Sequence, residues 1–434
     1  MAAIPGAESS NPPPASASQG EFAKALFQHL PSKERAELGL NLVDEIETLA
    51  HQALEDAGTE TRLCDWVRPK AARASGGRAP ALFRIANRDM PFLVDSILNT
   101  LLAEGAEASI LLHPVFRVVR DNAGRPTSIG VASVDHQTTS SRAGQRESLI
   151  LIGVNTISAD EADRIVSEIK TTLSSVAAAV RDWQPMLQRF GAAVDALETT
   201  TTSAPDDQKR EAVEFARWLV DGQFVFLGMR EFRLIGDAET GVLEVVDGSS
   251  LGVLEDSSVH VLRRGQEMVA LTPEIRRFYF EPQPLFVTKS NVISRVHRGV
   301  HMDYVGLKTY EPDGRLRGEL RVVGLFTSKA YTMPPGEIPM LRLRVERVIA
   351  QSGYVPGSHD AKALINVVDT FPRDELFQIP VGTLAEWAPQ IVDLETRPRT
   401  RVFARIDRFD RFVSVQVYLA RERFSTVVRE RIGQ

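Results

Sequence analysis

The sequence predicts an α+β fold in which helices pack against antiparallel sheets. The first observation is that three apolar runs of strand length alternate with two segments whose apolar residues recur at three- and four-residue spacing, as in helices. The strand-like runs are 82–86, 109–119 and 147–155, and the helix-like segments are 91–104 and 160–183. The second observation is a series of short strand-like segments with few helices between residues 224 and 326, which is typical of an antiparallel sheet.

The composition is that of an ordinary soluble globular protein. The chain has 434 residues, of which 43% are hydrophobic and 25% charged, enough for about three domains. A net charge of −6 gives no overall attraction to nucleic acid or to an anionic membrane. No apolar run approaches the ~18 residues of a membrane span, and the single cysteine, Cys64, fits a reducing compartment. We therefore expect a cytoplasmic protein with no nucleic-acid or membrane partner.

The sequence predicts little regular structure for the first 20 residues. Residues 1–20 are rich in Pro, Ala, Ser and Gly and lack the basic start and apolar core of a signal peptide, which indicates a disordered lead. Residues 21–77 predict a helical patch, over 22–30 and 36–54, followed by a linker of low order. A domain boundary is expected near residue 78.

Residues 78–198 predict a first compact domain. Their order of strand, helix, two strands and helix is most of a ferredoxin-like split βαβ unit, the plan of ACT-type amino-acid-binding modules. Ser158 and Glu161 have the spacing of a capping box at the start of the second helix. The apolar face expected on that helix consists of Ile165, Ile169, Leu173, Val176, Val180 and Trp183.

Residues 207–335 predict a PAS-like β-rich domain, which follows a polar linker over 199–207. The turn residues Pro312 to Gly314 predict a hairpin within it. The expected strands are 224–234, 241–246, 285–288, 304–310 and 319–326.

The rest of the chain predicts a helical connector and a hairpin. The connector, 336–398, includes a helix that Ser358 caps and Pro372 ends. Residues 399–434 predict a hairpin and a short helix, which we interpret as a domain that is cut short. One face of the hairpin carries only apolar side chains and is expected to lack its native cover: Val413, Val415, Val417 and Leu419.

The most informative stretch runs from Asn87 to Ser96, where a strand end, a tight turn and a helix start follow one another. Unpaired N–H groups at a helix start attract a carboxylate or a phosphate. The candidate effector-binding residues are Asn87, Asp89, Met90, Pro91 and Phe92. An effector's carboxylate would meet the backbone of residues 89–92, and Asn87 and Asp89 would be available to its ammonium group. Two alternatives are an ordinary strand-to-helix turn and a helix that Asp89 itself caps.

Other candidate sites have structural explanations. His297, His301 and Asp303 would gather metal ligands on a helix, but the surrounding sequence predicts a strand, in which residues four apart lie about 13 Å from each other. We therefore expect no metal site. Cys64 has no histidine nearby in the sequence and is not expected to be a nucleophile.

Two surface interpretations also stay open. A set of basic residues in the β-rich region is expected to be a solvated face rather than a nucleic-acid site: Arg295, Arg298, Lys308, Arg315, Arg317 and Arg321. The segment from Phe371 to Phe377 carries two aromatic residues around a charged turn. Either a docking surface or a helix end with its aromatic rings in the core explains it.

Several long stretches of this chain resemble the same protein family. They are Asn87 to Ser96, Leu111 to Val115, Phe224 to Phe232, Val296 to Arg298, Asp303 to Lys308, Gly324 to Tyr331 and Phe371 to Gln378. Together they resemble the N-terminal region of the large bacterial NAD-specific glutamate dehydrogenases, over roughly residues 80–434.

The resemblance implies a regulatory and assembly region. It implies an ACT-like domain, a PAS-like region and the opening of a second ACT-like domain in a homo-oligomeric parent enzyme. That parent would convert L-glutamate to 2-oxoglutarate and ammonia with NAD as cofactor, and an amino acid is the expected effector. Two other hypotheses are a self-standing amino-acid-binding module and, least favoured, a hydrolase that uses His297, His301 and Asp303.

The residues themselves offer no place for hydride transfer. A dinucleotide fold needs glycines at G-x-G-x-x-G spacing between a strand and a helix. The richest candidate, Asp247 to Gly252, has different spacing, and neither a Walker motif nor G-x-S-x-G nor H-E-x-x-H occurs. We therefore expect no cofactor and no catalytic residue in this chain.

We expect this chain to form no NADH from L-glutamate and NAD, because it carries no recognisable nucleotide-binding glycine loop. The measurement is NADH absorbance with purified chain, compared with a protein-free control. NADH formation that depends on both glutamate and the chain would contradict the expectation.

Overall fold

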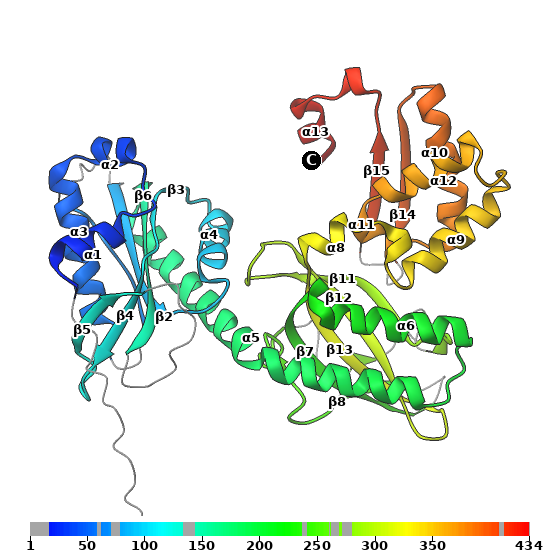
Figure 1. Ribbon diagram of the computed structural model, residues 1–434, viewed down its shortest axis with the longest axis horizontal. Helices are drawn as coiled ribbons and strands as arrows, with labels where there is room; N and C mark the ends of the chain where they lie inside the picture. Colours follow the sequence, from blue (N-terminus) through cyan, green and yellow to red (C-terminus); the bar gives the residue numbers. More distant parts are fainter. Residues whose placement is uncertain are drawn as a thin grey trace, which may run out of the picture. The chain divides into compact units, whose positions relative to one another are not determined.

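The computed structural model describes most of the chain. The described residues are 17–58, 62–70, 79–132, 144–236, 241–259, 261, 269–270, 280–407 and 412–433. Most of the expected lead and of the linker before residue 78 lies outside them. The chain forms two compact units, which Figure 1 shows: Met1–Val180 with Arg295–Gly299, and Arg181–Ser294 with Val300–Gln434. Within the described residues, no helix is both long enough and apolar enough to cross a membrane.

The first unit is built around an antiparallel sheet. Its strands are β1 (Arg62–Val67), β2 (Ala79–Arg88), β3 (Ala108–Leu112), β4 (Val115–Arg120), β5 (Pro126–Val131) and β6 (Gln145–Ile157). The order is β1-β2-β6-β4-β5, and β3 also pairs with β6. β6 thus lies between β2 on one side and both β3 and β4 on the other, as a split βαβ unit requires.

Helices cover both faces of this sheet (Figure 1). They are α1 (Gln19–Leu26), α2 (Ser32–Leu38), α3 (Leu40–Asp56), α4 (Leu93–Ala103) and the long α5 (Ala159–Thr199). α1 and α3 share a core with the sheet, in which Phe22 and Ile46 lie with Leu82 and Phe116. α4 and the first half of α5 contact each other through the hydroxyl groups of Thr100 and Thr172, 2.8 Å apart.

The expected domain boundary near residue 78 is wrong. β1 pairs with β2 in an unbroken register from Arg62↔Asn87 to Val67↔Leu82. Because α1 and α3 also bury their apolar faces against the same sheet, residues on both sides of position 78 form one core. The helical patch over 21–77 is therefore part of the first unit.

Some elements of the first unit differ locally from the elements that the sequence predicts. The strand expected over 109–119 is two strands, since Pro114 has no N–H to donate to a ladder. α5 continues past residue 183 to Thr199, with Pro185 inside it. Trp183, expected on the buried face of α5, has 47% of its surface exposed. The capping box is confirmed, because Ser158 and Glu161 bond each other's backbone N–H groups at 2.9 and 3.3 Å.

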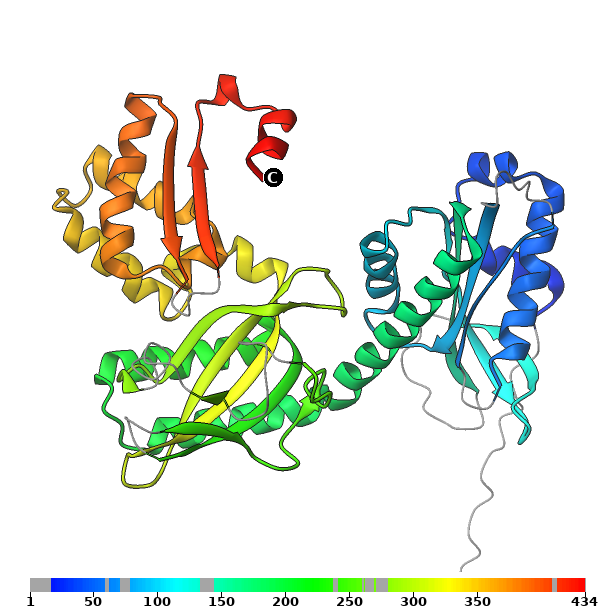
Figure 2. The ribbon, with the colours of Figure 1, turned by 180° about the vertical axis from the view of Figure 1, so that it is seen from behind.

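The second unit contains a larger antiparallel sheet. Its strands are β7 (Phe224–Ile235), β8 (Val242–Val245), β9 (Leu251–Gly252), β10 (Val269–Ala270), β11 (Leu285–Ile293), β12 (His301–Tyr310) and β13 (Leu316–Phe326). The order is β10-β8-β7-β13-β12-β11, and β9 also pairs with β7. The second half of α5 and α6 (Asp206–Trp218) lie on one face, and Figure 2 shows the sheet from its other side. Phe190 and Phe215 join Phe226 and Val322 in the core between them.

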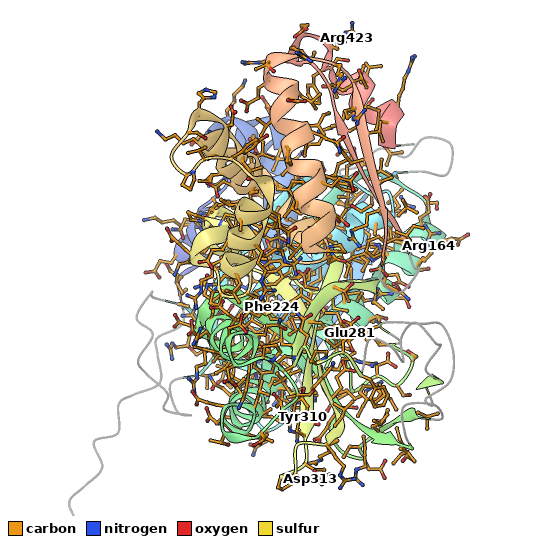
Figure 3. All side chains as sticks on the ribbon, turned by 90° about the vertical axis from the view of Figure 1, so that its right-hand side faces the viewer. Arg164, Phe224, Glu281, Tyr310, Asp313 and Arg423 are labelled. Atoms are coloured by element: carbon orange, nitrogen blue, oxygen red, sulfur yellow. The ribbon has the colours of Figure 1, made fainter. Side chains whose placement is uncertain are left out.

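The hairpin predicted at Pro312 to Gly314 is confirmed. Gly314 has a φ of 84° and its N–H donates to the Glu311 carbonyl at 2.9 Å, which closes the turn between β12 and β13. Figure 3 labels Asp313 at this turn, at the opposite end of the sheet from Phe224. Farther along β13, a Cβ at Gly318 would stand 2.0 Å from the Phe232 carbonyl oxygen, so only glycine permits this close approach of β7.

The remaining elements are a short π-helix between α6 and β7, a helical region after β13, and a hairpin followed by two short helices. They are π-helix η2 (Leu219–Gln223), α8 (Ser328–Thr332), η3 (Pro335–Glu337), α9 (Leu341–Ser352), α10 (His359–Thr370), α11 (Arg373–Leu376), α12 (Val381–Thr396), β14 (Arg401–Ile406), β15 (Val413–Tyr418), η4 (Arg421–Arg423) and α13 (Thr426–Gly433). Ser358 caps α10 as expected, accepting from the Ala361 N–H. Phe371 and Phe377 are buried in the core, so the docking interpretation of that segment is wrong.

The hairpin of β14 and β15 has one covered and one open face. The Phe403 ring lies 5.1 Å from Trp387 of α12 and 5.7 Å from Tyr418. On the opposite face Val413 and Val415 are 58% and 54% exposed. The other two residues of the expected uncovered face, Val417 and Leu419, are half-buried, so the prediction is confirmed for Val413 and Val415 only. The hairpin packs through its other side.

Replacing Phe403 with alanine should destabilise the second unit by about 3 kcal/mol, because it removes a buried ring and leaves a cavity. The matched change Val415→Ala, on the open face, should lower the stability of the second unit much less. Hydrogen exchange of the β14 and β15 amides during a urea titration measures both. Equal losses of protection in the two variants would show that the covered face does not hold the hairpin.

Candidate functional site

The turn after β2 positions the predicted site residues. Phe92 adopts φ 72° and ψ −1°, a left-handed conformation, and stands at the N-cap of α4 with no side-chain cap. The Asp89 N–H donates to the Arg146 carbonyl at 2.9 Å, which ties the turn to the start of β6. The helix therefore begins after the turn without help from a polar side chain.

Asp89 faces β6 rather than α4 or an open site. Its carboxylate accepts from Arg146 Nε at 3.0 Å and from Ser148 Oγ at 2.7 Å. The alternative in which Asp89 caps the helix is wrong, because its oxygens hold these two donors. The same bonds remove Asp89 as the free partner expected for an effector's ammonium group.

His113 extends this polar chain. Its Nε2 lies 3.2 Å from Ser148 Oγ, so Asp89, Ser148 and His113 form a line across the sheet. Burial lowers the pKa of His113 below its usual value, which the nearby Asp89 charge opposes and His29 reinforces. The imidazole is therefore neutral at neutral pH.

A loop distant in sequence also belongs to the first unit. Residues Arg295–Gly299 lie against α4, where the His297 N–H donates to Ser96 Oγ at 2.9 Å. The His297 carbonyl accepts from Asn99 Nδ2 at 2.6 Å, and its ring lies 5.1 Å from that of Phe92. Like Phe92, His297 has a positive φ, of 67°. Sequence reasoning missed this pairing because no local pattern links residues 201 positions apart.

The three residues considered as metal ligands, His297, His301 and Asp303, do not form a common site. His297 packs on α4 in the first unit, whereas His301 and Asp303 lie on β12 in the second. His301 Nδ1 stands 3.1 Å from the Ser290 carbonyl oxygen. Asp303 is buried, which raises its pKa to about 6, and it pairs with Lys289 at 2.7 Å. No cluster with metal-ligand composition occurs among the described residues.

The expected solvated basic face is wrong for two of its members. Lys308 and Arg321 are buried in the sheet of the second unit. The Arg321 guanidinium lies 3.8 Å from the Phe232 ring and donates to the Tyr304 hydroxyl at 2.8 Å. Tyr304 in turn donates to the buried Glu319. Arg315, by contrast, is largely exposed.

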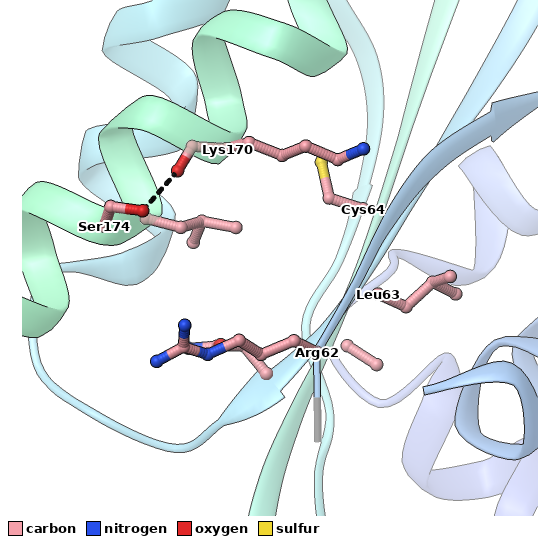
Figure 4. Close-up of a pocket in the computed structure, with 8 residues that line it drawn as sticks. Arg62, Leu63, Cys64, Lys170 and Ser174 are labelled. Carbon is pink, nitrogen blue, oxygen red and sulfur yellow. Dashed lines mark hydrogen bonds between the residues drawn. The ribbon is translucent and has the colours of Figure 1, made fainter. Parts of the chain in front are cut away.

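A cavity of about 220 Å³ opens between β1, β2 and α5 (Figure 4). Buried residues line its inner part: Cys64, Ala86 and Asn87. Exposed residues line its rim: Arg62, Lys170 and Ser174. Leu63 and Leu173 complete the wall. Burial raises the pKa of the Cys64 thiol to about 12, so the thiol is protonated and unreactive at neutral pH.

The five predicted site residues therefore have three different surroundings. Asn87 lies at the cavity with 4% of its surface exposed, and its Nδ2 donates to the Arg88 carbonyl at 3.1 Å. Asp89 faces β6, and Phe92 contacts His297. Met90 is half-buried and Pro91 exposed in the turn itself.

Acidification should destabilise the first unit through His113. The unfolded chain takes up a proton below about pH 6.5, the ordinary pKa of histidine, whereas the folded state resists it. The unfolding free energy should therefore fall as the pH drops through this range.

The change His113→Gln should make this pH dependence shallower, and His359→Gln, at an exposed site, should not. Urea unfolding at a series of pH values measures the slope. An unchanged slope in His113→Gln would refute the assignment.

Comparison with known proteins shows which protein family the chain resembles. Three family models match it in order: the glutamate dehydrogenase ACT1 domain over 22–169, helical motif 1 over 338–397 and the ACT2 domain over 401–434. The ACT1 match includes residues on both sides of position 78, in agreement with the single core.

Curated relatives agree with the models. The NAD-specific glutamate dehydrogenase of Halomonas elongata is 34% identical over 354 residues, which are 81% of this chain and 21% of that protein. The enzyme of the same name from Pseudomonas aeruginosa is 31% identical, with the same coverage. That of Mycobacterium tuberculosis is 29% identical and is matched over 20% of its length. The chain thus spans about a fifth of the length of these relatives, and it belongs to the NAD-specific glutamate dehydrogenase family, whose N-terminal region it matches.

Proposed function

We propose that this chain is the regulatory and assembly region of a large cytoplasmic NAD-specific glutamate dehydrogenase. The parent reaction is the NAD-dependent oxidative deamination of L-glutamate to 2-oxoglutarate and ammonia, with NAD held outside this chain. The observation that carries the proposal is the ordered match of this chain to the ACT1, helical motif 1 and ACT2 models, together with relatives of which the matched part is about a fifth. The same observation favours this role over a self-standing module.

The regulatory part of the proposal is binding of an amino-acid effector at the end of β2. Asn87 supports this position, because its amide lies at a cavity and one residue away from the turn that starts α4. The start of α4 has no side-chain cap, which leaves it suited to an anionic group. Met90, Pro91 and Phe92 form the turn, and Asp89 positions it through Arg146 and Ser148.

The assembly part concerns the second unit. We assign a PAS-like role to residues 207–335, whose antiparallel sheet carries helices on one face. Residues 336–398 connect it to a second ACT-like portion. The parent enzyme of this proposal is a homo-oligomer, and the support for it is the relation of the chain to the NAD-specific glutamate dehydrogenases.

A thermal-shift panel of common amino acids tests effector binding. An amino acid at 100 times its dissociation constant should add about 2.7 kcal/mol of stability. Asn87→Ala should weaken its affinity, whereas Asn122→Ala, in an exposed turn, should not. The absence of any stabilising amino acid would count against sensing, and equal affinities of wild type and Asn87→Ala would show that the site lies elsewhere.

A further inference from the structure

We propose that the cavity between β1, β2 and α5 binds a small dianion, either a short dicarboxylate or a phosphate group, through Arg62 and Lys170. This inference rests on the part of the proposed function that places an effector beside Asn87, and it differs from that proposal in the ligand, a dianion in place of an amino acid. It assigns the charge-bearing contacts to two residues that no local sequence pattern marks.

The side chains converge on this space for geometric reasons. Arg62 and Cys64 lie two apart on β1 and so share a sheet face, and Asn87 on β2 is the register partner of Arg62. Lys170 and Ser174 lie four apart on α5 and so share a helix face. In Figure 4, Lys170 reaches from the helix toward Cys64, and Arg62 reaches from the strand toward the helix.

The charge of the cavity is positive. Of the eight residues that line it, Arg62 and Lys170 are cationic and none is acidic. Three nearby carboxylates have partners of their own. Asp65 pairs with Arg84 at 2.5 Å, Glu168 pairs with Arg295 at 2.7 Å, and Asp163 accepts from the Trp66 indole at 2.7 Å. Two cations facing one small space favour a ligand with two negative charges.

The inner wall suits an anion as well. The Cys64 thiol is uncharged at neutral pH and so does not repel it. Asn87 is buried and uses one amide bond on the Arg88 carbonyl, so its second N–H is available to orient an anionic oxygen. Ser174 Oγ donates to the Lys170 carbonyl at 3.1 Å, which fixes the rim on the helix side.

Size and charge together select the ligand. The cavity holds about 220 Å³, the space of about seven waters, below the range of sites for drug-sized ligands or nucleotides. A zwitterionic amino acid would bring its ammonium group beside two cations with no carboxylate to pair it. We therefore expect dianions to bind best, acidic amino acids less well and neutral amino acids weakest.

The test is calorimetric titration of this chain with succinate, inorganic phosphate and glycine at fixed ionic strength. Arg62→Gln and Lys170→Gln should each raise the dissociation constant of the dianion about tenfold, the usual effect of losing a charge-assisted hydrogen bond. Lys33→Gln removes an exposed cation on α2 and should change nothing. Ser174→Leu, at an exposed helix position, should block the mouth without unfolding the chain.

The outcomes separate the two ligand sources. Succinate binding without phosphate binding identifies a dicarboxylate, and the reverse identifies a phosphoryl group. The proposal fails if neither dianion binds, if the Arg62 and Lys170 variants bind as the wild type does, or if glycine binds as tightly as the dianion. Binding of an amino acid that depends on Asn87 but not on Arg62 or Lys170 would overturn this proposal and leave the regulatory function standing.

Discussion

The first unit depends on a buried ion pair between Arg120 of β4 and Glu147 of β6. Glu147 is completely buried, and the guanidinium meets its carboxylate with two parallel bonds of 2.8 and 2.7 Å. The same guanidinium donates to the carbonyls of Gly124, in the turn after β4, and of Leu54, near the end of α3. Removing one partner of such a pair leaves a buried charge and typically costs about 3–5 kcal/mol.

This pair also sets the geometry of the candidate site. Side chains alternate across a strand, so the neighbours of Glu147 on β6, Arg146 and Ser148, point to the opposite face. There they hold Asp89 and with it the turn that starts α4. A slip of one residue in the β6 register would exchange the two faces and move both sets of contacts at once.

Sequence patterns predicted correctly those features that depend on residues close together in the chain. The turn at Gly314, the cap at Ser358 and the capping box at Ser158 each follow from residues within a few positions of one another. β1 was missed because its six residues show no strict alternation, and its stability comes from pairing with β2. Without β1 the sequence could not reveal the cavity.

The candidate site was predicted only in part, for the same reason. Asn87 and the turn carry a recognisable strand-to-helix pattern. By contrast, Arg62 and Lys170 come from distant segments and meet at the cavity only in the fold, and His297 meets Ser96 and Phe92 in the same way. Phe92 and His297 both adopt left-handed backbone conformations, which cost non-glycine residues about 1–3 kcal/mol. Two such conformations in contact show that tertiary packing, rather than local preference, determines this part of the site.

The hairpin of β14 and β15 is a local apolar surface with open strand edges, and such a surface favours association when a protein is concentrated. Within the described residues it is a two-stranded sheet, so the backbone groups along its outer edges have no strand partner, and Val402, Val413 and Val415 face solvent. Net charge of −6 spread over the whole chain gives weak repulsion at so local a surface once salt screens it. We therefore expect charged substitutions at Val413 and Val415 to raise the solubility of this chain.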